Sequence, residues 1–363
     1  MKKYFLLVVS AVALAFTSCS NSEEIEIKYQ VDLVVNPSSV LEPFHGFRIG
    51  GQNYGLDMYN KSDGKASLRI STYIYDNSGN RVDVYENLVD DYNSKVTIPI
   101  SVRDNEEYTI VSISSSILGT LQSPTAQSFT ISGSEKLSTL SILQQSINGI
   151  YSGNSFGTNW SILGASVRTI TSENKGVVDI NLSPITSMVK ISYNNVHAWD
   201  EYAVDTYAVQ YKNNSTATYS GNQFTFSTAL SNGQVSYSDL DVTENPGNSI
   251  AEIINILPCE NMEYNGLLFI GENRLDFVEA NENGAGTVNI QPGLEYECKI
   301  DCAEWAIEFT QENSTRSINA EPTMLMNSTI IKNSLDNNTS LAKSKNNLPQ
   351  SGVSIIELLN KKQ

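Results

Sequence analysis

The chain has 363 residues, of which 40 are Asp or Glu and 23 are Lys or Arg, so its formal net charge at pH 7 is −17. Such an acidic protein is repelled by nucleic acid phosphates and by anionic lipid headgroups, and we therefore exclude both as partners recognised through charge. Hydrophobic residues make up 40% of the chain, and at ~100–200 residues per domain its length predicts two domains. Abundant Tyr, Ser, Asn, Thr and Ile favour strands and turns.

Residues 1–18 are predicted to be a signal peptide. Two lysines precede an apolar run from Tyr4 to Phe16, which is shorter than the ~20 residues that span a bilayer. Small residues then lead into Cys19, and this junction resembles a bacterial lipobox, in which the Cys is acylated, for example with palmitate, and becomes the new N-terminus. The Glu pair after SCSNS resembles the surface-export signal of Bacteroidota lipoproteins. We predict an outer-membrane lipoprotein held through Cys19 by a tether over 19–27; the alternative is an ordinary signal peptide with an incidental Cys.

A first domain is predicted over residues 28–180. KYQVDLVV (28–35) alternates apolar and polar residues, which is typical of a half-buried strand. LRISTYIY (68–75) follows, and DNSGN (76–80) is a hairpin turn signal. Further strands are expected at 82–85, 95–100 and 108–113. The one short helix that we expect is Ser138–Ser146, a segment that also reads as a loop.

A second domain is predicted over residues 181–311. Short apolar runs separated by Gly, Asn and Asp predict strands at 177–182, 188–193, 207–211, 223–226, 250–257, 266–270, 287–290 and 296–300. Short strands at this spacing, without strand–helix alternation, predict an all-β fold of two consecutive β-sandwiches. The Asn- and Ser-rich tail over 312–363 contains the apolar segment VSIIELL (353–359). This segment either packs on its own domain or is donated to a neighbouring molecule as an added strand.

The sequence contains no recognisable catalytic motif. Its two histidines, His45 and His197, have no GxSxG, HExxH or CxxC motif beside them. We therefore predict a protein that is not an enzyme and needs no cofactor. A hydrolase built on paired carboxylates is the weakest alternative, because it requires two acids ~5–9.5 Å apart in a cleft.

Three cysteines follow Cys19 in the chain: Cys259, Cys298 and Cys302. Three thiols cannot all pair, and we predict buried free thiols, with a Cys259–Cys298 disulfide as the alternative. No histidine lies near them, so no metal site is predicted there. DNSGNRVD (76–83) departs from the spacing of a calcium loop, and the hairpin turn is preferred.

Four aromatic residues gather in the second half of the chain: Trp199, Tyr202, Tyr207 and Tyr211. Exposed rings of this kind can stack on the apolar faces of sugars, so these residues are candidate glycan contacts. Tyr207 and Tyr211 share the parity of a strand, which suits packing in a core equally well. Core packing is the preferred interpretation.

Several segments resemble the fimbrillin superfamily of Bacteroidota, which includes pilins and their anchor and accessory subunits. The similarity lies in LRISTYIYDNSGNRV (68–82), KVTIPISVRDNEEYTIVSIS (95–114), NLSPITSMVKISYNNV (181–196) and IQPGLEYECKI (290–300). The resemblance implies transthyretin-like, Greek-key sandwiches that assemble by strand exchange. A protease would cut after Arg48, releasing the first strand and the lipid, and a strand such as 353–359 from a partner would fill the groove. Anchor subunits would instead keep both.

Together these features predict a non-enzymatic, lipid-anchored protein at the cell surface or in a fimbrium. Its expected role is that of a fimbrial subunit in pilus assembly, anchoring or adhesion. Its expected partners are other fimbrial subunits, the membrane through the lipid, and a host or bacterial surface ligand. The main alternative is a surface glycan-binding lipoprotein of a nutrient-uptake system.

Overall fold

The computed structural model describes residues 27–44, 67–122, 124–127, 129–144, 162–198, 200, 204, 206–213, 216–226, 234–241, 247–270, 273–276, 286–303 and 306–311. In these ranges the chain is mostly β-strand, with short 3₁₀ turns such as η1 (Pro37–Val40) and η3 (Leu137–Thr139). None of the described helices is long and apolar enough to cross a membrane. The predicted all-β fold of sandwich domains is confirmed.

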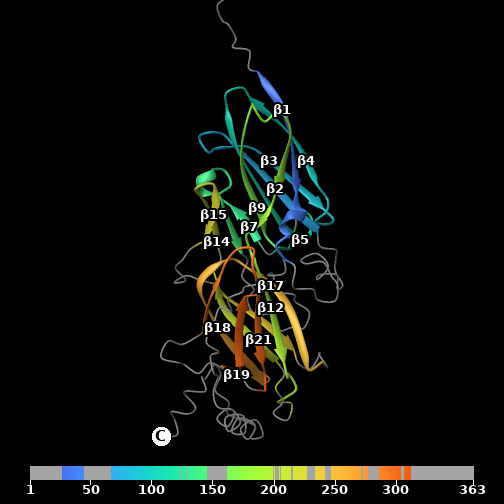
Figure 1. Cartoon of the computed structure of the whole chain (residues 1–363), viewed down its shortest axis with the longest axis vertical. Helices are drawn as coiled ribbons and strands as arrows, with labels where there is room; N and C mark the ends of the chain where they lie inside the picture. The colour runs from blue at the N-terminus through green and yellow to red at the C-terminus, as the bar shows by residue number, and fades with distance from the viewer. Residues whose placement is uncertain are drawn as a thin grey trace, which may run out of the picture.

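Two facing sheets form the first sandwich (Figure 1). The smaller sheet has the order β10–β1–β4, with β1 at Lys28–Asn36, β4 at Val96–Arg103 and β10 at Gly176–Asn181. The larger has the order β11–β9–β5–β2–β3, and β6 pairs with β5. Its strands are β2 (Ser67–Tyr75), β3 (Arg81–Val89), β5 (Glu107–Gly119), β6 (Pro124–Gln127), β9 (Gly164–Thr171) and β11 (Ser183–Pro184). Alternating side chains from both sheets meet in one apolar core.

The second sandwich is built in the same way. One sheet has the order β17–β12–β21–β22, with β12 at Ser187–Asn194, β17 at Ser249–Ile256, β21 at Glu295–Asp301 and β22 at Ala306–Gln311. The other has the order β16–β13–β18–β19, and β20 pairs with β18. Its strands are β13 (Thr206–Asn213), β16 (Gln234–Asp241), β18 (Cys259–Ile270), β19 (Asn273–Asp276) and β20 (Gly286–Ile290). Tyrosines dominate the core between these sheets.

The two sandwiches repeat one pattern of strand pairing. In the first, β1 lies between antiparallel β4 and parallel β10, while β5 pairs with β2 and β9. In the second, β12 lies between antiparallel β17 and parallel β21, while β18 pairs with β13 and β20. β1 and β12 therefore hold equivalent central positions in the two halves of the chain.

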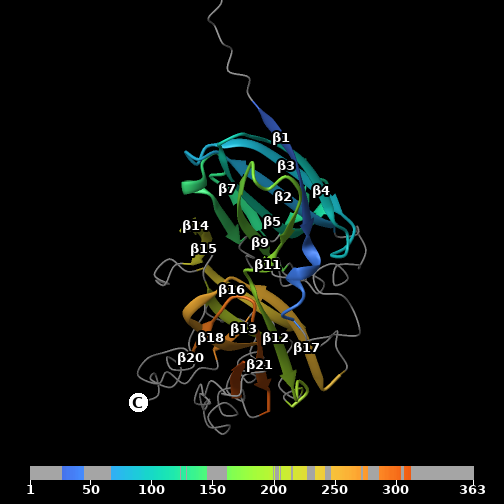
Figure 2. The same cartoon turned by 45° about the horizontal axis from the view of Figure 1, so that its top comes forward.

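A further four-stranded sheet contains strands from both halves of the chain. Its order is β15–β14–β8–β7, with β7 at Phe129–Ser132, β8 at Ser141–Gln144, β14 at Thr216–Ser220 and β15 at Gln223–Phe226. Its inner side chains pack on β2, β5 and β9 of the first sandwich. The range 181–311, which the sequence suggests is one domain, thus contributes a hairpin to the other sandwich, and Figure 2 shows β14 and β15 above the second sandwich.

The helix predicted over 138–146 is wrong. Leu137–Thr139 form a 3₁₀ turn and Ser141–Gln144 form β8, which pairs with β7 on one side and β14 on the other. Along this strand Ile142 and Gln144 are buried and Leu143 between them is exposed, the alternation that is typical of a strand.

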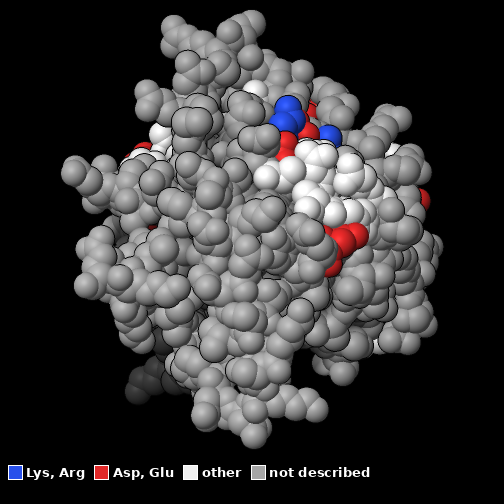
Figure 3. Space-filling model, turned by 90° about the horizontal axis from the view of Figure 1, so that it is seen from below, with Lys and Arg blue, Asp and Glu red and all other residues white. Residues whose placement is uncertain are grey.

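Charged side chains on the second sandwich are partly neutralised by local pairing. Glu297 on β21 lies 3.1 Å from Lys190 Nζ and 3.3 Å from Lys299 Nζ, and it accepts a hydrogen bond from Ser192. Seen from below, the described surface carries basic and acidic side chains next to each other, beside uncharged surface (Figure 3).

Candidate functional site

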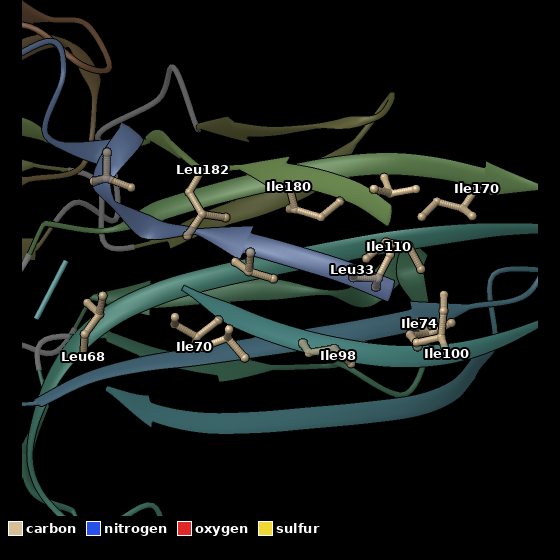
Figure 4. Close-up of a cluster of buried hydrophobic side chains, with 14 of the residues drawn as sticks. Leu33, Leu68, Ile70, Ile74, Ile98, Ile100, Ile110, Ile170, Ile180 and Leu182 are labelled. Carbon is tan, nitrogen blue, oxygen red and sulfur yellow. The ribbon is translucent and has the colours of Figure 1, made fainter. Parts of the chain in front are cut away.

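The strongest candidate site is the position that β1 occupies in the first sandwich. β1 pairs along its length with β4, from Lys28 opposite Arg103 to Val35 opposite Val96, and in parallel with β10 from Val31 to Asn36. Its alternating residues Val31, Leu33 and Val35 are fully buried. Figure 4 shows Leu33 pointing into the core between the two sheets. The alternation predicted for residues 28–35 therefore places one face of β1 in the core.

Polar contacts fix the C-terminal end of β1. Asn36 Nδ2 donates to Asn181 Oδ1 at 3.4 Å, and Ser39 Oγ donates to the carbonyl of Leu182 at 2.7 Å. Ser39 Oγ also contacts the carbonyl of Asn36 at 2.9 Å. These bonds join the turn after β1 to the end of β10, so strand and turn are held as one unit.

Small residues beneath this turn leave little free space. A Cβ atom added at Gly164 would lie 2.3 Å from Val40 Cγ2 and 2.7 Å from Ser114 Oγ. Real Cβ atoms do not approach neighbours so closely, which explains why glycine stands there. Val40 is fully buried against this glycine, so the segment after β1 is as tightly packed as the strand itself.

The wall of the core on β2 and β5 is partly polar. Thr72 Oγ1 and Ser112 Oγ form a hydrogen bond at 3.0 Å, and Ser114 and Ser116 are also fully buried. Tyr92 is buried close to this row, and burial raises its pKa to about 12, with a smaller opposing effect from Ser116. Hydroxyls in this wall lower the cost of its exposure to water relative to a wall of aliphatic side chains.

β1 contributes a large part of the stability of the first sandwich. Complete burial of an aliphatic side chain is worth about 1.5–3 kcal/mol, so the loss of Val31, Leu33, Val35 and Val40 would cost roughly 6–12 kcal/mol. This is comparable to the entire stability of a typical domain, about 5–15 kcal/mol. β4 and β10 would also lose their ladder partners. To restore the buried contacts and the ladder pairing together, a strand would need the same alternation of apolar and polar residues.

Several predicted site residues lie outside the described residues. They include the lipidation candidate Cys19, the cleavage candidate Arg48, and the aromatics Trp199 and Tyr202. His45 and the apolar segment 353–359 also lie outside. For these residues the sequence-based predictions stand as predictions.

Tyr207 and Tyr211 are not glycan contacts. Both side chains lie in the core of the second sandwich, with 0% and 2% of their surface exposed. Burial raises the pKa of the Tyr207 phenol well above its usual range. The glycan-contact hypothesis is wrong for these two residues because their shared strand parity points them inward, as the core interpretation requires.

The described histidine and the three described cysteines lie in different environments. His197 Nδ1 lies 3.1 Å from Asp200 Oδ2, on the surface. Cys259, Cys298 and Cys302 are buried, as predicted, and form no disulfide with one another; burial strongly raises the pKa of Cys302. A raised pKa keeps the thiol protonated and unreactive. No group of three or more His, Cys, Asp or Glu among the described residues could hold a metal ion.

Sequence reasoning missed the polar contacts around Asn36, Ser39 and Asn181. The local signal is Asn-Pro-Ser-Ser at 36–39, since Asn and Ser before and after a Pro favour a turn that ends a strand. Their partners on β10 are more than 140 residues away in the chain. No local pattern could have identified them.

No protein-family model matches the chain, and no curated protein matches it. Several solved structures, in contrast, match the chain. A "putative cell adhesion protein" from Bacteroides ovatus has a TM-score of 0.42 and 10% identity, covering 78% of this chain and 96% of that chain. The fimbrial anchor protein Mfa2 from Porphyromonas gingivalis has a TM-score of 0.39 and 13% identity, covering 82% and 100%. A fimbrial assembly protein from Parabacteroides distasonis has a TM-score of 0.35 and 12% identity, covering 79% and 96%. These structures are fimbrial and adhesion proteins of Bacteroidota, the group that the sequence motifs resemble.

Proposed function

We propose that this chain is a non-enzymatic fimbrial subunit of the cell surface that joins other subunits through the β1 position. The observation that supports the proposal is the central place of β1, paired on both edges and fully buried along one face. Strand addition supplies affinity through main-chain hydrogen bonds and specificity through alternate side chains. A strand from a second subunit would need apolar residues at the places of Val31, Leu33 and Val35.

Cys19 is the proposed point of lipid attachment. Lys28, where β1 begins, is nine positions further along the chain, with eight residues between the two. An extended chain spans at most 3.3–3.6 Å per residue, so the start of β1 would lie within roughly 30 Å of the lipid. A subunit that keeps β1 would thus stand at the membrane as an anchor. A cut after Arg48 would remove the lipid and β1 together, and the subunit would join a filament.

Limited trypsin digestion of the purified protein tests the proposal. We expect a new N-terminus at Ile49 and, on unboiled gels, a ladder of polymers that collapses on heating. A synthetic peptide of β1, KYQVDLVVN, should suppress the ladder because it refills the vacated position. A peptide with Ser in place of Val31, Leu33 and Val35 should not.

Two variants make the test specific. Arg48→Gln should abolish the ladder, whereas Lys136→Gln, exposed in the turn between β7 and β8, should leave it intact. A protein cut after Arg48 that remains monomeric would overturn strand exchange. Polymers that form equally well in the presence of the β1 peptide would place the contact elsewhere.

A further inference from the structure

A notch lies where the β14–β15 hairpin of the first sandwich meets the second sandwich. Its volume is about 350 Å³, and it is lined by Phe226 at the end of β15, by residues 258–261 around the start of β18 and by residues 289–292 around the end of β20. Phe226 packs against the apolar cluster that contains Leu257 and side chains of the first sandwich. Ligand pockets of ~300–1,000 Å³ occur preferentially at such junctions between domains.

The backbone of β18 is distorted at this notch. The ladder between β18 and β20 shifts its register between Cys259 and Met262, and Asn261 adopts a left-handed conformation with φ of 52°. The N–H of Asn261 donates to Asn289 Oδ1 at 2.8 Å. Bulges of this kind redirect a side chain out of the strand pattern and often lie beside functional sites. Here the bulge brings two side-chain amides to one wall of the notch.

Gln291, also in the lining, has a backbone held by hydrogen bonds. The N–H of Gln291 donates to the hydroxyl of Tyr296 at 2.9 Å, and its carbonyl accepts a hydrogen bond from Ser187 Oγ. The side chain of Gln291 is exposed on this support. A group held in this way loses little conformational freedom when a ligand binds.

The chemistry of the lining indicates a neutral ligand rich in hydroxyl groups. The side-chain amides of Asn261, Asn289 and Gln291 offer donors and acceptors in pairs, which match adjacent hydroxyls on a sugar ring. Phe226 and the two prolines supply apolar surface for the C–H face of that ring. Glu260 is exposed among them, and the lining contains no basic residue. With a net charge of −17, the protein repels acidic sugars.

We propose that this notch binds one unit of a neutral glycan. Its described lining contains neither Tyr207 nor Tyr211 and no part of β1. Glycan binding therefore does not depend on strand exchange: failure of the trypsin test leaves it intact, and failure of glycan binding leaves the fimbrial role intact.

Native gel electrophoresis of the full chain in gels cast with a polysaccharide tests the proposal. The probes are dextran, yeast α-mannan and galactomannan as neutral polymers, and polygalacturonate as an anionic one. We expect retardation by at least one neutral polymer and none by polygalacturonate. Titration calorimetry with oligosaccharides from the retarding polymer then gives the affinity.

Two variants of the notch remove amides without disturbing the fold. Asn261→Gly keeps the left-handed backbone, because glycine adopts it without strain, and Gln291→Ala keeps both backbone hydrogen bonds of that residue. Each should weaken binding about tenfold, the effect of one lost hydrogen bond. The matched controls are Asn105→Gly, at another left-handed turn, and Gln223→Ala, at the far end of β15; both should bind as the unchanged protein does.

Three results would overturn the assignment. They are the absence of retardation by every neutral polymer, stronger retardation by polygalacturonate, and unchanged affinity in Asn261→Gly and Gln291→Ala. Affinity lost equally in the two control variants would also place the site elsewhere. Unfolding temperatures measured for all four variants separate a lost contact from a lost fold.

Discussion

Replacement of Leu33 by Ala provides the most direct test of the central role of β1. Leu33 is fully buried and lies opposite Ile98 on β4 and Val178 on β10, both of which are also buried. Truncation removes three carbons from a core that has sheet on both sides, so the cavity cannot collapse fully. Leu→Ala changes at such sites cost about 2–5 kcal/mol. We expect a loss of about 3 kcal/mol in the free energy of unfolding of the first sandwich.

The assay is urea denaturation followed by circular dichroism. With a slope of roughly 2 kcal/mol per M, the midpoint of the first transition should fall by about 1.5 M. Val34→Ala is the matched control, because this neighbour points to the other, half-exposed face of β1 and should shift the midpoint by less than about 0.5 M. Trypsin-induced polymerisation should also be faster in Leu33→Ala than in Val34→Ala, since β1 is held less strongly.

Equal midpoints for Leu33→Ala and Val34→Ala would refute this reasoning. They would mean that β1 contributes no buried face to the sandwich in solution. The proposal that its position receives a strand from another subunit would then lose its energetic basis.

Three further predictions concern packing and pH. Gly164→Ala should destabilise the first sandwich by about 1–3 kcal/mol through the clash with Val40, and urea denaturation of Gly164→Ala combined with Val40→Ala should recover part of the loss. Burial acts against the charged form of Glu297, but its hydrogen bonds and ion pairs with Lys190 and its neighbours prevail and lower its pKa. Its stabilising effect is therefore present at neutral pH and is lost as the pH falls below the usual carboxyl range, so Glu297→Gln should show a smaller drop in melting temperature between about pH 5 and 3. Burial raises the pKa of Tyr92 to about 12, so its stabilising effect is full below about pH 10 and is lost towards pH 12. Tyr92→Phe should accordingly lose less stability than the unchanged protein between about pH 9 and 11, as measured by thermal unfolding.

Local periodicity in the sequence predicts the strands well and their partners poorly. The alternation in residues 28–35 identifies both β1 and its buried face, because the side chains of a strand alternate between two faces. It does not reveal that β1 pairs in parallel with β10, which lies about 145 residues further along the chain. Parallel pairing leaves no signature between neighbouring residues.

The errors at β8 and at the tyrosines have the same physical origin. Ser141–Gln144 is too short for a pattern to separate strand from helix, and its state is decided by pairing with β7 and β14. Tyr207 and Tyr211 are correctly expected to share one face of a strand, but whether that face is core or solvent depends on the opposite sheet. The notch at Asn261 is likewise formed by segments that no short window contains.

β1 and β12 hold equivalent positions in their sheets but differ in how the chain connects them to the rest of the protein. Both are central strands between an antiparallel and a parallel neighbour. One cut in the segment 45–66 would free β1 together with everything that precedes it. A cut after β12 would free nothing, because β12 follows directly on β11, which pairs with β9 in the first sandwich. The chain therefore holds β12 on both sides, whereas a single cut can separate β1 from the rest of its sandwich.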